Sequence, residues 1–179
     1  MKILVSMCLL GIPCRYDGKA CVHEGVLALS GEHTLIPVCP EQLGGLCTPR
    51  PPAERRSGEV VTMDGADVTQ AYRAGAEAAL LLAKRLGCTL AVLKERSPSC
   101  GKGSIYDGTF SGTLTQGNGV TAELLLKNGI PVLGESAVAR GVKLNCPCKR
   151  VACERFGDCE ACRAFHAAHK KGRTPCERG

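Results

Sequence analysis

The chain has 179 residues, of which 13 are cysteine and none is tryptophan, and its formal net charge is +6. A chain of this length can bury a hydrophobic core without disulfides, which excludes a disulfide-stapled miniprotein. No stretch has the length of a membrane span, about 20 apolar residues, and the residues after Met1 do not form a secretory signal. We therefore expect a cytoplasmic protein with reduced thiols. The odd cysteine count excludes complete pairing and points to metal, cluster or thiol chemistry.

The positive charge is concentrated at the C-terminal end of the chain. Residues 1–139 carry 13 basic and 13 acidic side chains, whereas residues 140–179 carry 10 basic and 4 acidic ones. Six of the 13 cysteines also lie in these last residues. This shift in composition predicts an α/β domain over residues 1–139 and a small basic, cysteine-rich extension over residues 140–179.

The first half of the chain is predicted to contain three strands and a helix. The strands follow from short apolar runs at Ile3–Val5, Thr34–Val38 and Val60–Thr62. Apolar residues at helical spacing predict a helix over Asp67–Leu86. Asp67 is its expected N-cap, with Gln70 three residues later, and Gly87 its expected end.

The second half continues the alternation of strands and helices. Leu90–Leu93 and Ile130–Leu133 are predicted strands, and a helix from about Gly119 to Lys127 lies between them. Asn118 is the expected cap of this helix, and Gly129 marks its end. An alternation of this kind is typical of a parallel sheet flanked by helices, which is the predicted fold class.

Three cysteines follow three of these strands. Cys8 comes after the first strand, Cys39 after the second, and Cys100 lies in the loop after Leu90–Leu93. Ligands bind outside the carboxyl ends of the strands in parallel sheets, so the three cysteines are expected to meet at one edge. Their wide spacing differs from the close ligand pairs of a zinc finger. The pattern permits an iron–sulfur cluster on three thiolates, and it also permits three small buried core residues.

Blocks in the same order along the chain resemble the bacterial thiouracil desulfidase family. The match runs from Met1 to about Glu135, and Met7 departs from it where the family has a small residue. The matching blocks are Ile3–Gly11, Arg15–Gly18, Pro37–Glu41, Gly44–Leu46, Pro49–Glu54, Val68–Thr69, Gly75–Ala76, Leu93–Gly101 and Ile105–Gly112.

The resemblance implies a Rossmann-like domain that holds a [4Fe-4S] cluster on Cys8, Cys39 and Cys100. It also implies that the chain removes sulfur, without redox chemistry, from thiolated uracil or a thiouridine nucleotide. Its motifs assign catalytic roles to Glu41, as the base that activates water, and to Ser97, with Ser99 as a second candidate. The sequence lacks a G-x-G-x-x-G fingerprint, so a nicotinamide or flavin is not expected.

Other residues of the first 139 have less specific predictions. Four basic residues are candidates to hold a substrate phosphate: Arg15, Arg50, Lys94 and Lys102. No ligand role is assigned to Cys14, Cys21, Cys47 or Cys88, although Cys14 or Cys47 is a candidate for the fourth iron of a resting cluster. His23 and His33 are expected to be structural or to face solvent.

The extension has its own cysteine pattern. The pairs Cys146/Cys148 and Cys159/Cys162 have the spacing that suits tetrahedral zinc, and Cys153 lies between them. A second cluster, a redox dithiol and a metal-free basic tail are the alternatives. The basic residues could attract nucleic acid, but the scarcity of aromatic side chains argues against such a partner.

The sequence leaves more than one function open. The first prediction is an iron–sulfur-dependent desulfidase acting on a small thiolated base or nucleotide. The alternative is a non-catalytic iron–sulfur or zinc binding protein, for example a redox sensor. A third possibility is an enzyme that uses an open iron for hydration or dehydration. The pattern makes no prediction of the oligomeric state.

Overall fold

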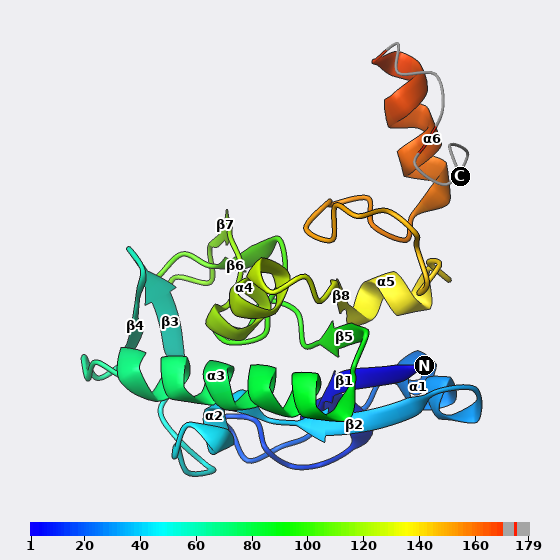
Figure 1. The fold of residues 1–179 in the computed structure, drawn as a ribbon. Coiled ribbons are helices and arrows are strands. Elements are labelled where there is room, and N and C mark those ends of the chain that lie inside the picture. The colour runs from blue at the N-terminus through cyan, green and yellow to red at the C-terminus, as the bar shows by residue number, and fades with distance from the viewer. Residues whose placement is uncertain (170–173, 175–179) are drawn as a thin grey trace.

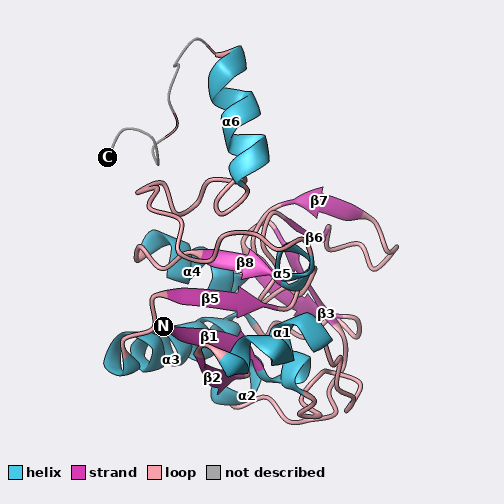
Figure 2. Cartoon of the chain, turned by 90° about the vertical axis from the view of Figure 1, so that its right-hand side faces the viewer, coloured by secondary structure: helices cyan, strands magenta, loops and turns pink. Residues whose placement is uncertain are grey.

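The computed structural model describes residues 1–169 and residue 174. Four parallel strands form its central sheet in the order β2–β1–β5–β8. The strands are β1 (Lys2–Ser6), β2 (Thr34–Val38), β5 (Leu90–Leu93) and β8 (Val132–Gly134). Helices flank this sheet (Figures 1 and 2), which confirms the predicted fold class.

Each face of the sheet is covered by its own helices. Leu4 and Val132 pack toward α3 (Thr69–Leu86) and α4 (Val120–Lys127). Ile3 and Val5, the neighbours of Leu4 along β1, pack on the opposite face, where α1 (Glu24–Ala28) and α5 (Glu135–Ala139) lie. This alternation follows from the two-residue period of a strand and produces a core on both sides of the sheet.

Short elements connect the sheet to its helices and extend beyond it. Two 3₁₀ turns, η1 (Met7–Leu10) and η2 (Leu29–Gly31), follow β1 and α1, and α2 (Pro40–Leu43) follows β2. Two antiparallel ribbons lie outside the main sheet: β3 (Ala53–Arg56) with β4 (Glu59–Thr62), and β6 (Ser104–Tyr106) with β7 (Leu114–Gln116). The predicted strand at Val60–Thr62 therefore exists, but in a ribbon.

Two predicted helix caps are wrong. Helix α3 begins at Thr69 with Val68 as its N-cap, because the N–H of Val68 donates to the Val60 carbonyl at 2.9 Å. Asp67 instead accepts a hydrogen bond from the Thr69 N–H at 2.8 Å. Gly119 is the N-cap of α4, and the Asn118 side chain accepts from the N–H of Gly103. Contacts with other segments, rather than local capping, set both helix starts.

The two glycines predicted to end helices have the expected backbone conformation. Gly87 ends α3 with φ 69°, and Gly129 follows α4 with φ 77°. A residue with a side chain adopts such positive φ values only with strain, so glycine is favoured at both ends.

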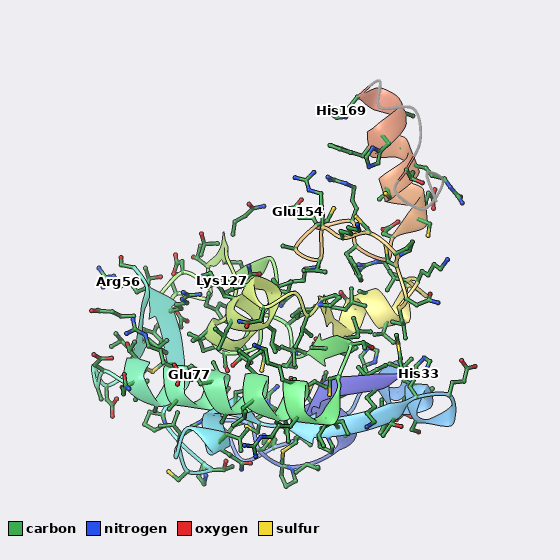
Figure 3. All side chains as sticks on the ribbon, in the orientation of Figure 1. His33, Arg56, Glu77, Lys127, Glu154 and His169 are labelled. Carbon is green, nitrogen blue, oxygen red and sulfur yellow. The ribbon has the colours of Figure 1, made fainter. Side chains whose placement is uncertain are left out.

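The chain after α5 first folds back on the body and then leaves it. The N–H of Lys143 donates to the Gly157 carbonyl at 2.8 Å, and Phe156 is buried in the core on the α1 side of the sheet. Helix α6 (Cys159–Ala168) then projects away from the sheet (Figures 1 and 2). Figure 3 labels Glu154 on the loop before α6 and His169 at the far end of this helix. The division into residues 1–139 and 140–179 stays a prediction.

Within the described part of the chain, no helix is both long enough and apolar enough to cross a bilayer.

Candidate functional site

A cavity of about 500 Å³ opens at the carboxyl ends of β1, β2 and β5. Cys8 lies in η1, the turn that follows β1, Cys39 directly follows β2 as the N-cap of α2, and Cys100 lies in the loop after β5. All three side chains line this cavity and are 6%, 8% and 5% exposed. The structure therefore brings together the three cysteines that the sequence places after three parallel strands.

Two of the three thiols, Cys39 and Cys100, have raised pKa values and favour the protonated form in the metal-free protein. Burial raises the pKa of Cys100 to about 12, although a hydrogen bond with Ser6 lowers it in part. Contact with the Cys14 thiol, together with burial, raises the pKa of Cys39. Metal ligation uses the thiolate, so binding of a metal group here must release protons.

A fourth thiol lies among these three. Cys14 is 2% exposed and lines the same cavity. A hydrogen bond with Cys39 lowers its pKa, but a hydrogen bond with Cys8, burial and the charge of Cys8 raise it to about 11. The Cys39 thiol also donates to the Cys14 carbonyl at 3.8 Å. The sequence singled out Cys14 only as one of two candidates, and its place in a loop gave no stronger signal.

Glu41 lines the cavity from the first turn of α2, next to Cys39. Arg50 holds its Oε2 atom with two donors, Nε at 2.7 Å and a terminal nitrogen at 2.6 Å. A second interaction comes from Tyr72, a buried residue of α3. Burial, the charge of Glu41 and a hydrogen bond to it raise the pKa of Tyr72. The Glu41 carboxylate is therefore fixed in position by a cation and faces a neutral phenol.

Two glycines allow this arrangement. A Cβ atom at Gly75 of α3 would lie 1.9 Å from the Pro40 carbonyl oxygen, and one at Gly44 would lie 2.0 Å from the Ala71 oxygen. Only residues without a side chain let α2 approach α3 this closely. The approach brings the start of α2, which carries Glu41, to the turn of α3 that carries Tyr72.

The two predicted serines have different surroundings. Ser97 lines the cavity, and its Oγ accepts hydrogen bonds from the N–H groups of Ser99 and Cys100, both at 3.1 Å. Ser99 is fully buried, and its hydroxyl pairs with that of Thr121 at 2.9 Å. The lone pairs of Ser97 are used by the backbone, so its O–H is the group that it can offer to a bound molecule. The geometry favours Ser97 over Ser99.

Only some of the four basic residues predicted to hold a substrate phosphate are placed to bind a phosphate group in the cavity. Arg50 lines the cavity but is committed to Glu41, and Lys94 is committed to an ion pair with Glu135. Lys102 donates to the carbonyl of Cys153 at 3.5 Å and is not among the cavity-lining residues. Burial lowers its pKa, although the charges of Cys153 and Glu154 raise it in part.

Two arginines remain at the cavity with less commitment. Arg15 pairs with Asp17, two residues along, at 3.2 Å in a partly exposed position. Arg96 is exposed, lines the cavity and has no ion pair within residues 1–169. Its backbone φ of 63° is unusual for a residue with a side chain. Arg96 was not among the residues predicted from the sequence, although its place between Glu95 and Ser97 in a matching block was an available signal.

Apolar and aromatic side chains line other parts of the cavity, including Tyr16, Met63, Tyr106 and Phe110. The loop that carries Phe110 is held by Glu54, whose Oε2 accepts the N–H groups of Gly108 at 2.9 Å and Phe110 at 3.0 Å. Flat aromatic and apolar surfaces beside a few polar groups are typical of small-molecule sites.

Most other predicted residues have structural roles. His23 is the N-cap of α1 and accepts from the Val26 N–H at 3.2 Å, as expected for a structural residue. Cys88 is buried in the core, whereas Cys47 is exposed and donates to the Pro49 carbonyl at 3.3 Å. Neither Cys21 nor Cys47 is among the cavity-lining residues.

The cysteines of the extension converge less closely. Cys146, Cys159 and Cys162 line a small cavity of about 40 Å³ near the start of α6, and Cys148 is not part of its lining. Among residues 1–169 and 174, no group of three or more His, Cys, Asp or Glu side chains is placed to hold a single metal ion. The zinc site at Cys146, Cys148, Cys159 and Cys162 therefore stays a prediction.

Comparison with known proteins gives consistent matches. The family model of 2-thiouracil desulfurase matches residues 3–137. The uncharacterized protein YbbK of Bacillus subtilis (strain 168) is 46% identical over 144 residues, which are 75% of this chain and 95% of YbbK. A solved structure of the [4Fe-4S]-dependent thiouracil desulfidase TudS is 49% identical, with a TM-score of 0.73 over 78% of this chain and 93% of that one.

Proposed function

Because this chain belongs to the 2-thiouracil desulfurase family, we propose that it hydrolyses the carbon–sulfur bond of a thiolated uracil or thiouridine nucleotide and releases hydrosulfide. Family membership confirms the resemblance recognised in the sequence. It also favours an enzyme over the non-catalytic binding protein or redox sensor that the sequence left open. The observation that carries the proposal is the convergence of Cys8, Cys39, Cys100 and Glu41 on one cavity.

The donor set of the cavity fits an iron–sulfur cluster. Three thiols reach the cavity from three separate loops, and no other metal ligand type is required, because soft thiolates suit iron–sulfur clusters. The same thiols are not grouped to hold a single ion, whereas in a cluster each thiolate binds a different iron. The similarity to TudS, which is [4Fe-4S]-dependent, supports this choice. Cys8, Cys39 and Cys100 are the proposed ligands.

A [4Fe-4S] cluster on three thiolates supplies one iron without a protein ligand, a Lewis acid that polarises a thiocarbonyl group. Glu41 accepts a proton from the water that attacks the ring carbon. Arg50 keeps the carboxylate in place for this step. Ser97 donates a hydrogen bond to the ring or passes a proton. The carbon gains an oxygen from water and loses its sulfur as hydrosulfide, so no electron donor is needed.

A nucleotide substrate would place its phosphate near the less committed cations. Arg15 and Arg96 line the cavity, and guanidinium groups bind phosphate through paired donors. The aromatic and apolar side chains of the cavity offer surfaces for a pyrimidine ring. Two substrates, the nucleotide 4-thiouridine monophosphate and the free base 2-thiouracil, should therefore respond differently to Arg96→Gln. The value of kcat/KM should fall for the nucleotide and stay native for the base, and an equal fall for both would contradict a phosphate contact.

The experiment that tests the proposed function is anaerobic reconstitution with iron and sulfide, followed by incubation with each substrate in ¹⁸O-labelled water. The proposal predicts one hydrosulfide released for each oxygenated product, with the label in the product and no added reductant. A reconstituted protein that releases no sulfide from either substrate, or that requires an electron donor, contradicts it. The absence of sulfide release would favour the non-catalytic binding protein or the hydration or dehydration enzyme instead.

We propose separately that the extension binds zinc through Cys146, Cys148, Cys159 and Cys162. The support is the cavity that three of these four residues share. Metal analysis of the purified protein should find one zinc per chain, with the zinc lost in Cys159→Ser. A chain purified with its thiols reduced and without zinc contradicts this proposal.

A further inference from the structure

A fourth thiol of the cavity has no part in the mechanism above. Cys14 is almost fully buried and lies in hydrogen-bonding contact with the thiols of both Cys8 and Cys39. Resting on the proposed function, we propose that Cys14 binds the cluster iron that the other three cysteines leave free, until a substrate sulfur displaces it. The cysteine would then protect the open iron and set the threshold for substrate binding.

The backbone around Cys14 is anchored toward the cavity. The loop after η1 folds back, because the Ile12 N–H donates to the Met7 carbonyl at 3.2 Å and the Cys21 N–H donates to the Cys8 carbonyl at 2.9 Å. The Cys14 carbonyl accepts from Arg50 at 3.1 Å and from the Cys39 thiol. These contacts hold the backbone of Cys14 in place beside the cavity.

The other spare cysteines do not share this position. Residues 1–139 are all described, and of their four cysteines beyond the proposed ligands only Cys14 lines the cavity. Cys47, the other candidate for the fourth iron, is exposed and hydrogen-bonded to its own loop. The structure thus distinguishes Cys14 from Cys47 as the candidate for the fourth iron, which the sequence could not do.

Arg50 connects Cys14 to the proposed base. The same guanidinium group donates to the Cys14 carbonyl and holds Oε2 of Glu41. If the Cys14 thiol binds the open iron, its own carbonyl also contacts the arginine that holds Glu41. When the substrate sulfur replaces it, the Cys14 sulfur takes up a proton and returns to a buried thiol. No electron is transferred in this exchange.

Competition between Cys14 and the substrate has a measurable size. If Cys14 occupies the iron in about nine molecules of ten, the apparent affinity for substrate falls about tenfold, in proportion to the fraction left open. Removing the thiol should then lower the KM for 2-thiouracil about tenfold at an unchanged kcat. The open iron would also be lost about tenfold faster during oxidation, because it is unprotected ten times as often.

The test compares the native chain with Cys14→Ser, Cys14→Ala and the matched control Cys47→Ser, all reconstituted anaerobically. Iron content and the EPR signal of the three-iron form are followed during exposure to ferricyanide, and KM and kcat are measured with 2-thiouracil. Both Cys14 variants should lose iron about tenfold faster and show the lower KM. The control should match the native chain.

Two results would overturn the inference. Iron loss at the native rate in both Cys14 variants means that this thiol does not shield the iron. Failure of both variants to hold a cluster, in a chain that is otherwise folded by circular dichroism, means that Cys14 is a permanent ligand. The iron-loss measurement needs no turnover. A native chain that holds a cluster but releases no sulfide therefore contradicts the proposed function without deciding the role of Cys14.

Discussion

The cavity and the extension organise their cysteines in opposite ways. Cys8, Cys39 and Cys100 are far apart in the sequence, yet they lie buried around one cavity. Cys146, Cys159 and Cys162 lie much closer together in the sequence, yet they are partly exposed around a much smaller cavity. Parallel strands bring distant residues to one edge because their carboxyl ends lie side by side. Close sequence spacing alone gives proximity without the burial and fixed geometry of the cavity.

The supporting contacts differ in the same way. Around the cavity, Arg50 holds Glu41, Ser97 holds the backbone at Cys100, and Glu54 holds the loop at Phe110. In α6, no residue is buried, and Phe165 contacts Arg155, whose guanidinium carbon lies 3.8 Å from the ring centroid. Functional side chains need a supporting shell, and the contacts of Arg50, Ser97 and Glu54 supply one around the cavity.

The largest expected effect concerns the base at the cavity. Glu41→Gln should keep the cluster absorbance and lower kcat by about 10²–10⁴-fold, the usual contribution of a general base. The exposed Glu77→Gln on α3 is the matched control and should retain native kcat. Near-native turnover in Glu41→Gln would remove Glu41 from the mechanism.

Removing Arg50, the partner of Glu41 in the ion pair, should lower kcat less than Glu41→Gln does and should also lower stability. Arg50→Gln removes both donors from Oε2 of Glu41 and leaves a largely buried carboxylate unpaired. We expect the free energy of unfolding to fall by about 3–5 kcal/mol, the usual cost of removing one partner of a buried pair. Urea denaturation of the metal-free protein measures it. A free energy of unfolding equal to the native value within error would show that the ion pair does not stabilise the fold.

The two phenylalanines of the extension offer a direct comparison of its two parts. Phe156 is buried in the core, so Phe156→Ala should cost about 3–5 kcal/mol of stability. Phe165 is only partly buried on α6 and contacts Arg155, so Phe165→Ala should cost about 0.5–1 kcal/mol. Thermal unfolding of both variants measures the difference. Equal costs would mean that α6 is as firmly packed as the segment before it.

A last pair of variants separates the two serines of the cavity loop. Ser99→Ala breaks a buried hydroxyl pair with Thr121 and should lower stability by about 1–3 kcal/mol, because the partner hydroxyl is left unsatisfied, with kcat unchanged. Ser97→Ala should instead lower kcat, since Ser97 lines the cavity. The reverse pattern, with kcat lost only in Ser99→Ala, would exchange their assignments.

The sequence predicted the sheet and the convergence of three cysteines, because short apolar runs and their order are strong local signals. It misplaced the starts of α3 and α4. Asp67 and Asn118 have the chemistry of caps, but packing against β4 and against the loop at Gly103 decides where each helix begins. Local capping preferences lost to tertiary contacts in both cases.

The surroundings of the cavity were harder to predict than its cysteines. Tyr72 reaches Glu41 only because Gly75 and Gly44 allow α2 and α3 to meet closely. Lys102 was expected near a phosphate, but it bonds to the extension, whose path the sequence does not reveal. The place of Arg96 in the cavity lining could be recognised only from the three-dimensional path of its loop. Contacts between segments distant in sequence leave no periodic signal in a single chain.

The most direct test of the account is the iron and acid-labile sulfide content of anaerobically reconstituted single variants. The native chain and the tail variants Cys146→Ser and Cys159→Ser should each hold about four iron atoms. Cys8→Ser, Cys39→Ser and Cys100→Ser should each lose most of that iron and the associated absorbance. Full iron content in any of the three cavity variants, or iron lost in the tail variants instead, would contradict the assignment of the cluster to the cavity.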